Sequence, residues 1–369
     1  MTRYIEGFRK MDAASHFRTT LAEQGRQLAE QGRSIHLMEV CGSHTMAIAR
    51  FGIRDFLPAA ISLVSGPGCP VCVTDPGYID AAITLAGQGK IIATFGDMLR
   101  VPGSRTSLAE ARAAGGRVEV CYSPLTAIEL ARNHPETEVV FLAVGFETTI
   151  APVVAMLDAV IRQAIDNVSL LTAFKRVPPA LSALIADPEI QIDGLLCPAH
   201  VSAIIGADAY RPYAEQYGVA CVVAGFEPLD ILYGLQGLTQ QLLENRPHVD
   251  NQYGRVVKAE GNRQAQRLME HYLLPADASW RGLGTIPASG LVLRPEFARF
   301  DAVHRHGILP TPGRINPRCQ CGEVLKGKIR PAQCPLFGVA CHPDKPLGPC
   351  MVSSEGSCAA DFKYARGGA

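Results

Sequence analysis

The chain has 369 residues and a mass of 39.6 kDa. This exceeds the roughly 250–300 residues at which a single hydrophobic core stops growing, so two or three domains are expected. A hydrophobic share of 47% excludes a disordered chain, and equal numbers of basic and acidic side chains, 35 each, disfavour a nucleic-acid partner.

The N-terminal residues carry charges throughout and lack the apolar stretch of a signal peptide. The longest apolar run, Val139 to Phe146, is far below the roughly 18 residues of a membrane span. We therefore expect a cytoplasmic protein with no membrane partner. Because the cytosol is reducing, its twelve cysteines indicate metal ligation, redox exchange or burial rather than static disulfides.

The first predicted element is an exposed helix over residues 15–33, in which Leu21 and Leu28 share one face. We assign residues 1–34 to a helical lead segment that serves for docking.

Eight short apolar runs follow, most of them ending in Gly, Pro or Asp before a helical pattern: IHLMEV, AISLVSG, IIATFGD, RVEVCYSP, EVVFLAVGFE, NVSLLTAF, DGLLCPAH and VACVVAGFE. This alternation predicts an α/β fold of parallel sheets covered by helices on both faces.

We predict two related parallel-sheet α/β domains, residues 35–135 and 136–245. Their relation is suggested by two strand ends that read alike, Ala143 to Glu147 and Val223 to Glu227. Beyond about Arg246 the alternation fades, and residues 246–369 are predicted to form a small cysteine-rich domain. The chain contains neither a G-x-G-x-x-G turn nor a G-x-x-x-x-G-K-[ST] loop, so it carries no nucleotide fingerprint.

The first candidate site is the segment Met38 to His44, a strand that runs into a glycine turn. At the end of a parallel strand, Cys41 would project into the crevice where α/β proteins bind ligands. His44 could orient Cys41, deprotonate it or share a metal with it. An ordinary turn is the alternative interpretation.

The second candidate is GPGCPVC, in which Cys69 and Cys72 form a C-x-x-C directly after an apolar strand. In an α/β protein this pattern favours a dithiol that opens and closes. Half of a zinc site is the alternative, but it needs a second pair that the chain does not obviously offer.

Isolated cysteines in strands are predicted to be core residues: Cys121, Cys197 and Cys221. Three more residues follow apolar strands, where α/β proteins form their ligand crevice: Glu147, His200 and Glu227. Ion pairing is the alternative interpretation of these residues.

The densest signal is at the C-terminus, where six cysteines fall within 40 residues: Cys319, Cys321, Cys334, Cys341, Cys350 and Cys358. Their neighbours are Pro, Gly, Lys and Arg, which cannot bury so many thiols as core residues. Zinc and an iron-sulfur cluster are both bound by thiolates. The irregular spacing lacks the paired knuckles of zinc ribbons and favours a cluster.

Ten motifs together resemble the HypD family of hydrogenase maturation factors, from about Ile35 to Tyr364: MEVCGSHT, GPGCPVCV, TFGDMLRVPG, GFETT, AGFEPLD, NQYGRVV, WRGLG, CGEVLKGK, CPLFGVAC and MVSSEGSCAA. The resemblance implies that Cys41 holds an iron under construction and that Cys69 and Cys72 are a redox pair. It further implies a 4Fe-4S cluster bound by Cys321, Cys334, Cys341 and Cys358, with Cys319 and Cys350 outside the ligand set.

The family also implies a small HypC-type partner, a HypE-type cyanide donor and, indirectly, the hydrogenase large subunit. We therefore expect an iron-sulfur scaffold and redox protein on which an Fe(CN)2CO unit is assembled, rather than a conventional turnover enzyme. One position departs from the family pattern, since Met46 stands where a second histidine is usual. A cluster-dependent disulfide reductase resembling ferredoxin:thioredoxin reductase is the alternative, and a zinc-stabilised interaction module is a second rival.

Overall fold

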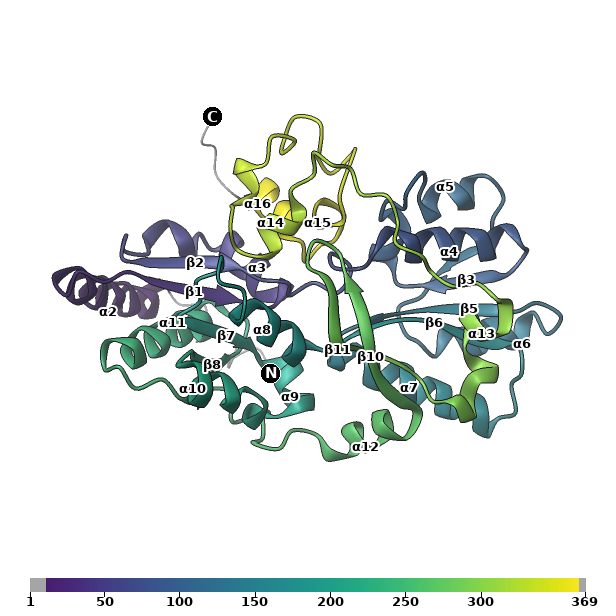
Figure 1. Cartoon of the computed structure of the whole chain (residues 1–369), viewed down its shortest axis with the longest axis horizontal. Helices are drawn as coiled ribbons and strands as arrows, with labels where there is room; N and C mark the ends of the chain where they lie inside the picture. The colour runs from purple at the N-terminus through teal and green to yellow at the C-terminus, as the bar shows by residue number, and fades with distance from the viewer. Residues whose placement is uncertain (1–10, 365–369) are drawn as a thin grey trace.

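The computed structural model describes residues 11–364, with side chains described from Ser15 onward, and shows two β-sheets flanked by helices (Figure 1). All eight apolar runs form strands. Every pairing among these eight strands is parallel, which confirms the predicted α/β class.

The first sheet is parallel throughout and has the order β2-β1-β7-β8-β9. Its strands are β1 (Ile35–Glu39), β2 (Ile61–Ser65), β7 (Gly194–Pro198), β8 (Ala220–Ala224) and β9 (Val249–Asn251). The helices around it are α2 (Met11–Glu30), α3 (Gly42–Arg50), α8 (Val177–Ile185), α9 (Ala199–Ile205), α10 (Arg211–Tyr217) and α11 (Pro228–Leu243). Adjacent β1 side chains belong to opposite cores, since Leu37 packs with residues of α2 and α11, and Met38 with residues of α8.

The N-terminal helix is confirmed, but its apolar face is not exposed. Leu21 and Leu28 are fully buried in the core that includes α11, and Gln24 donates to the Gln240 side chain over 3.0 Å. The helix therefore docks on its own chain.

The second sheet has the order β10-β11-β6-β5-β3-β4. Its strands are β3 (Ile91–Thr94), β4 (Val118–Val120), β5 (Val139–Gly145), β6 (Val168–Lys175), β10 (Leu273–Trp280) and β11 (Gly284–Leu293). Its helices are α4 (Pro76–Gly87), α5 (Leu108–Ala113), α6 (Thr126–Asn133), α7 (Glu147–Arg162), α12 (Arg263–Tyr272) and α13 (Ala302–His306). The antiparallel hairpin of β10 and β11 lies in the region where the sequence pattern fades, and the sequence did not predict it.

The chain passes repeatedly between the two sheets. After β1 and β2 it builds β3 to β6 of the second sheet, returns for β7 to β9, and then adds β10 and β11 to the second sheet. Each sheet therefore contains strands from both predicted segments, 35–135 and 136–245. Whether each segment folds as a unit stays a prediction. The two sheets, however, do not follow the boundaries of the two segments.

The cysteine-rich C-terminal segment, from Cys319 to Tyr364, consists of short helices and turns. It is drawn in yellow above the region between the sheets (Figure 1). Its helices are α14 (Cys321–Leu325), α15 (Pro349–Val352) and α16 (Ser357–Tyr364). The 3-10 turns of the chain are η1 (Ile53–Phe56), η2 (Gly96–Arg100), η3 (Ala207–Tyr210), η4 (Pro295–Phe300) and η5 (Pro331–Gln333). Within residues 11–364, no helix combines the length and the apolarity that crossing a membrane requires.

Candidate functional site

Two of the predicted motifs meet because their strands are neighbours. Cys41 follows β1 and precedes α3, whereas Cys69 follows β2. β1 and β2 pair in parallel, so their carboxyl ends lie at the same edge of the sheet. The amide of Gly42 donates to the Gly68 carbonyl over 3.0 Å, which joins the Cys41 turn directly to the loop of the C-x-x-C.

Glycine makes this close approach possible. A Cβ atom on Gly68 would lie 2.2 Å from the backbone nitrogen of Cys41, closer than real atoms approach. A Cβ atom on Gly42 would lie 2.3 Å from Cβ of Glu355, in the C-terminal segment. Three segments far apart in sequence therefore pack backbone against backbone, which requires residues without side chains at the contacts.

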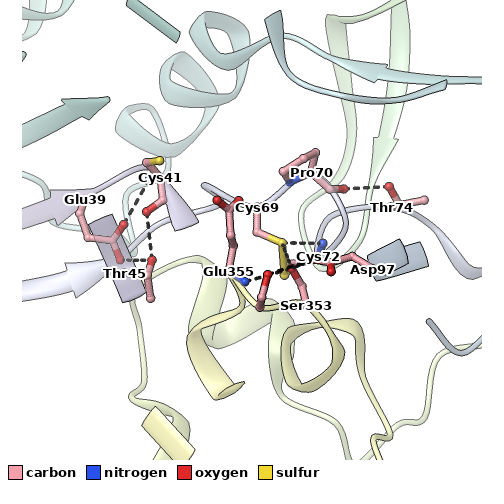
Figure 2. Close-up of a disulfide and its surroundings, with 11 residues drawn as sticks. Glu39, Cys41, Thr45, Cys69, Pro70, Cys72, Thr74, Asp97, Ser353 and Glu355 are labelled. Atoms are coloured by element: carbon pink, nitrogen blue, oxygen red, sulfur yellow. Dashed lines mark hydrogen bonds between the residues drawn. A yellow bond between two sulfur atoms is a disulfide. The ribbon is translucent and has the colours of Figure 1, made fainter. Parts of the chain in front are cut away.

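Cys69 and Cys72 are joined in a disulfide with their Cα atoms 5.2 Å apart, and both residues are buried (Figure 2). The Cys72 amide donates to Sγ of Cys69 over 3.1 Å. The same sulfur lies 3.4 Å from Oγ of Ser353, which donates to the Asp97 carboxylate over 3.0 Å. Because Asp97 belongs to η2, which follows β3, the dithiol lies where both sheets and the C-terminal segment meet.

Cys41 is only 2% exposed, so it does not stand at an open crevice mouth as we expected from the sequence. Its sulfur lies 3.8 Å from Nε2 and 3.9 Å from Nδ1 of His200. Burial, reinforced by the negative charge of Glu355, raises the pKa of the Cys41 thiol to about 12. The cause is the packing of the C-terminal segment and the His200 side chain around a turn that sequence alone presents as open.

Glu39 anchors this turn from behind. Its carboxylate accepts hydrogen bonds from the Cys41 amide over 3.2 Å and from the Thr45 hydroxyl over 2.6 Å (Figure 2). Burial raises the pKa of Glu39 to about 7, although the Arg54 guanidinium, 3.7 Å away, opposes the rise. The carboxyl group thus fixes the strand-to-helix turn that presents Cys41.

The His44 side chain makes its hydrogen bond elsewhere than at Cys41, the residue that it was predicted to orient or deprotonate. Its Nε2 bonds to the Gly225 carbonyl over 2.8 Å, and burial lowers its pKa to about 4. The imidazole in contact with the Cys41 sulfur is that of His200, which follows β7, the neighbour of β1. Both imidazoles pack on the Phe226 ring, at centroid distances of 4.8 and 5.0 Å. The CPAH strand end was the available signal for His200, but its proximity to Cys41 depends on strand order.

Sulfurs of the C-terminal segment also come together. Sγ of Cys319 lies 3.2 Å from Sγ of Cys321. A hydrogen bond between the Cys358 and Cys321 thiols is the largest cause that raises the Cys358 pKa, followed by burial. Sγ of Cys341 accepts from the Leu347 amide over 3.3 Å. Of the other two cysteines, Cys350 is fully buried and Cys334 partly buried against the same core.

These residues suit a thiolate-bound cofactor in their chemistry. A Cβ atom on Gly348 would lie 2.7 Å from Sγ of Cys321 and 2.9 Å from Sγ of Cys319, so the backbone wraps closely round the sulfurs. The buried Arg281 guanidinium nearby leaves Nε and Nη1 without partners, as expected beside an anionic group. Within residues 11–364, however, no set of three or more His, Cys, Asp or Glu side chains is closed into a metal site. The predicted ligand set therefore stays a prediction.

The remaining sequence candidates are core cysteines and two glutamates at strand ends. The three strand cysteines are buried as predicted: Cys121, Cys197 and Cys221. Glu147 begins α7 and accepts from the Val177 amide over 3.0 Å. Glu227 is the residue before α11, so each of the two similar strand ends leads directly into a helix, one from each sheet.

Comparison with known proteins places this arrangement in context. Residues 16–365 match the HypD family, described as "Hydrogenase formation hypA family". The chain is 46% identical to hydrogenase maturation factor HypD of Azotobacter vinelandii over 99% of this chain and 97% of the relative. It is 45% identical to hydrogenase expression/formation protein HupD of Azotobacter chroococcum mcd 1 over the same shares. It is 41% identical to HypD of Escherichia coli K12 over 98% of each chain.

Proposed function

The chain belongs to the HypD family of hydrogenase maturation factors, and from this premise we propose that it is a scaffold on which an Fe(CN)2CO unit is assembled in the cytoplasm. The observation that carries the proposal is the packing of the Cys41 turn against both the dithiol loop and the C-terminal segment. A thiol for the iron and a dithiol for electrons thus occupy one site.

In this proposal the iron is cargo and Cys41 is its ligand from this chain. Thiolate suits a soft, low-spin iron that carries cyanide and carbon monoxide. A second thiolate from a HypC-type partner would let the iron pass between proteins, and a HypE-type partner would deliver cyanide. Because Cys41 is buried beside His200, loading and release require local opening of the surrounding segments.

Cys69 and Cys72 would serve as the two-electron group of the scaffold. Opening their disulfide consumes two electrons and two protons and yields two thiols, and closing it releases them. A 4Fe-4S cluster held by Cys321, Cys334, Cys341 and Cys358 would supply one-electron chemistry when bound. The contact between Cys69 and Ser353 supports this division, because it joins the dithiol to the cysteine-rich segment.

A cluster-dependent disulfide reductase would use the same dithiol but would give Cys41 no role. The structure packs Cys41 directly on the dithiol loop, with the Gly68 carbonyl accepting from the Gly42 amide. Such close packing favours the scaffold, in which both groups act on one cargo.

Replacing Cys41 by alanine tests the proposal. The Cys41→Ala chain, purified anaerobically with its small partner, should lose the cyanide and carbonyl infrared bands but keep its acid-labile sulfide, because the two iron sites use separate cysteines. Cys121→Ala, which removes a buried thiol directly after β4, is the matched control and should keep both. Bands of wild-type intensity in the Cys41→Ala complex would refute the iron assignment.

The cluster ligands are tested by iron and sulfide content after anaerobic reconstitution. We predict that Cys334→Ala and Cys358→Ala lose most of the bound sulfide, whereas Cys350→Ala retains it. Cys350 is the control because it is fully buried in the same segment. Full content in Cys334→Ala, or loss in Cys350→Ala, contradicts the ligand set.

A further inference from the structure

The tip of the β10–β11 hairpin carries a buried arginine into the cysteine-rich segment. In Figure 1 the green hairpin reaches from the second sheet to the yellow C-terminal helices. Trp280 and Gly284 pair across its end, and the Leu283 amide closes the turn on the Trp280 carbonyl over 3.0 Å. Arg281, within this turn, is 4% exposed.

Two contacts hold the tip between the dithiol and the cysteine-rich segment. The Arg281 amide donates to the carbonyl of Val73, the residue after Cys72, over 2.8 Å. On the other side, a Cβ atom on Gly282 would lie 2.3 Å from Cα of Gly322, the residue after Cys321. Gly282 also has a φ of +82°, which glycine adopts without strain. Arg281 is thus clamped between the two cysteine motifs.

The guanidinium has polar atoms without protein partners. Both Nε and Nη1 are buried and make no hydrogen bond. The guanidinium lies within electrostatic range of the Cys319 sulfur, which is 3.2 Å from the Cys321 sulfur. A buried cation without a counterion is costly, so a protein retains one chiefly where a bound group supplies the missing partner.

We propose that Arg281 is a positioning residue that faces the thiolate-bound cluster, compensates its negative charge and raises its reduction potential. The inference rests on the cluster assignment of the proposed function. One electron makes a thiolate-bound cluster more negative, and a nearby cation in a low-dielectric site stabilises that state. The Arg281 amide also contacts the residue after Cys72, so the hairpin tip joins the dithiol loop to the cysteine-rich segment.

The first test is a redox titration of the full chain, with dithionite supplying one electron per cluster and electron paramagnetic resonance measuring the reduced form. At the wild-type midpoint, Arg281→Met should show about a tenfold lower ratio of reduced to oxidised cluster, equal to about 59 mV for one electron. Arg281→Lys keeps the charge and should shift less. Arg267→Met, an exposed site on α12, should titrate as wild type. An unchanged midpoint in Arg281→Met overturns the inference.

The second test uses the cluster-free chain and separates this role from ordinary packing. Without the cluster, Arg281 is a buried charge with unpaired atoms, so Arg281→Met should have a melting temperature equal to or above wild type. After reconstitution the order should reverse, with the variant losing its cluster faster to a chelator. A lower melting temperature for cluster-free Arg281→Met means that the side chain has a structural role, and overturns the inference.

The cluster assignment and the Arg281 inference are refuted by different results. A wild-type chain that binds no iron and sulfide after reconstitution refutes the cluster assignment and the Arg281 inference with it. A wild-type chain that binds the cluster while Arg281→Met matches its potential refutes only the Arg281 inference.

Discussion

Glu147 illustrates how burial of a single carboxyl group overrides its favourable place at the start of a helix. It lies at the first position of α7, where the helix dipole stabilises negative charge. Burial nevertheless raises its pKa to about 7 from 4.5. Its Oε2 is buried without a hydrogen-bond partner, which accounts for the direction of the shift.

This shift predicts a pH-dependent contribution to stability. The folded chain binds more protons at Glu147 than the unfolded chain between about pH 4.5 and 7, so its contribution falls as pH rises through this range. Between these pH values the ionisation of Glu147 lowers the free energy of unfolding by up to about 3 kcal/mol. Glu147→Gln cannot ionise, so this decrease should be absent from the variant. The measurement is urea unfolding at pH 5 and pH 7.5, with exposed Glu136→Gln as the control. Equal pH slopes for wild type and Glu147→Gln would contradict the prediction.

The surroundings of Cys41 were predicted only in part. The strand-end position of Cys41 follows from its sequence, because an apolar run and a glycine turn are local signals. Its burial and its contact with His200 do not follow, since both depend on residues more than 150 positions away. For the same physical reason, the sequence favoured His44, the nearest histidine along the chain, over the one nearest in space.

At the level of elements, the site depends on two strand-to-helix turns that touch. β1 and β2 lie in register, with Leu37 opposite Leu63, which brings the Cys41 turn and the dithiol loop to the same height. Only residues without a Cβ fit between them, as Gly68 shows. The relative position of Cys41 and the dithiol is therefore set by backbone packing.

Gly68→Ala tests this packing. The added Cβ would overlap the Cys41 backbone, so we expect a loss of about 1–3 kcal/mol in the free energy of unfolding. Gly87→Ala in α4 is the control, because a Cβ there meets no atom within 4 Å and should be neutral or stabilising. Both are measured by urea denaturation of the full chain. Equal stability of Gly68→Ala and wild type would show that the two turns are not tightly packed in solution.

At the scale of the whole molecule, the two sheets are interleaved along the chain. β1 needs β7, and β3 needs β5, as their neighbours. The sequence segments 35–135 and 136–245 each contribute two strands to each sheet, and β9, β10 and β11 follow residue 245. The cysteine-rich segment then covers the region where the sheets and their strand-end turns meet (Figure 1).

A fragment test follows from this topology. Residues 1–135 alone should show no cooperative thermal transition by circular dichroism, because the fragment lacks β7 and β5, the neighbours that join β1 and β3 to the rest of their sheets. Residues 1–308, which contain every strand of both sheets, are the matched comparison and should unfold cooperatively. A cooperative transition in the 1–135 fragment would instead support residues 35–135 as an independent domain.

The sequence by itself determined the eight parallel strands, the positions of Cys41 and of the C-x-x-C at strand ends, and the family. These are local signals: an apolar run specifies a buried strand, and a glycine or proline specifies its end. Tertiary structure alone decided which strands pair, and therefore that His200 meets Cys41, that Ser353 meets Cys69 and that Arg281 reaches the cysteine-rich segment. An apolar run predicts that a strand is buried, but it does not predict which strand lies beside it, because many strands of the chain have equally apolar faces.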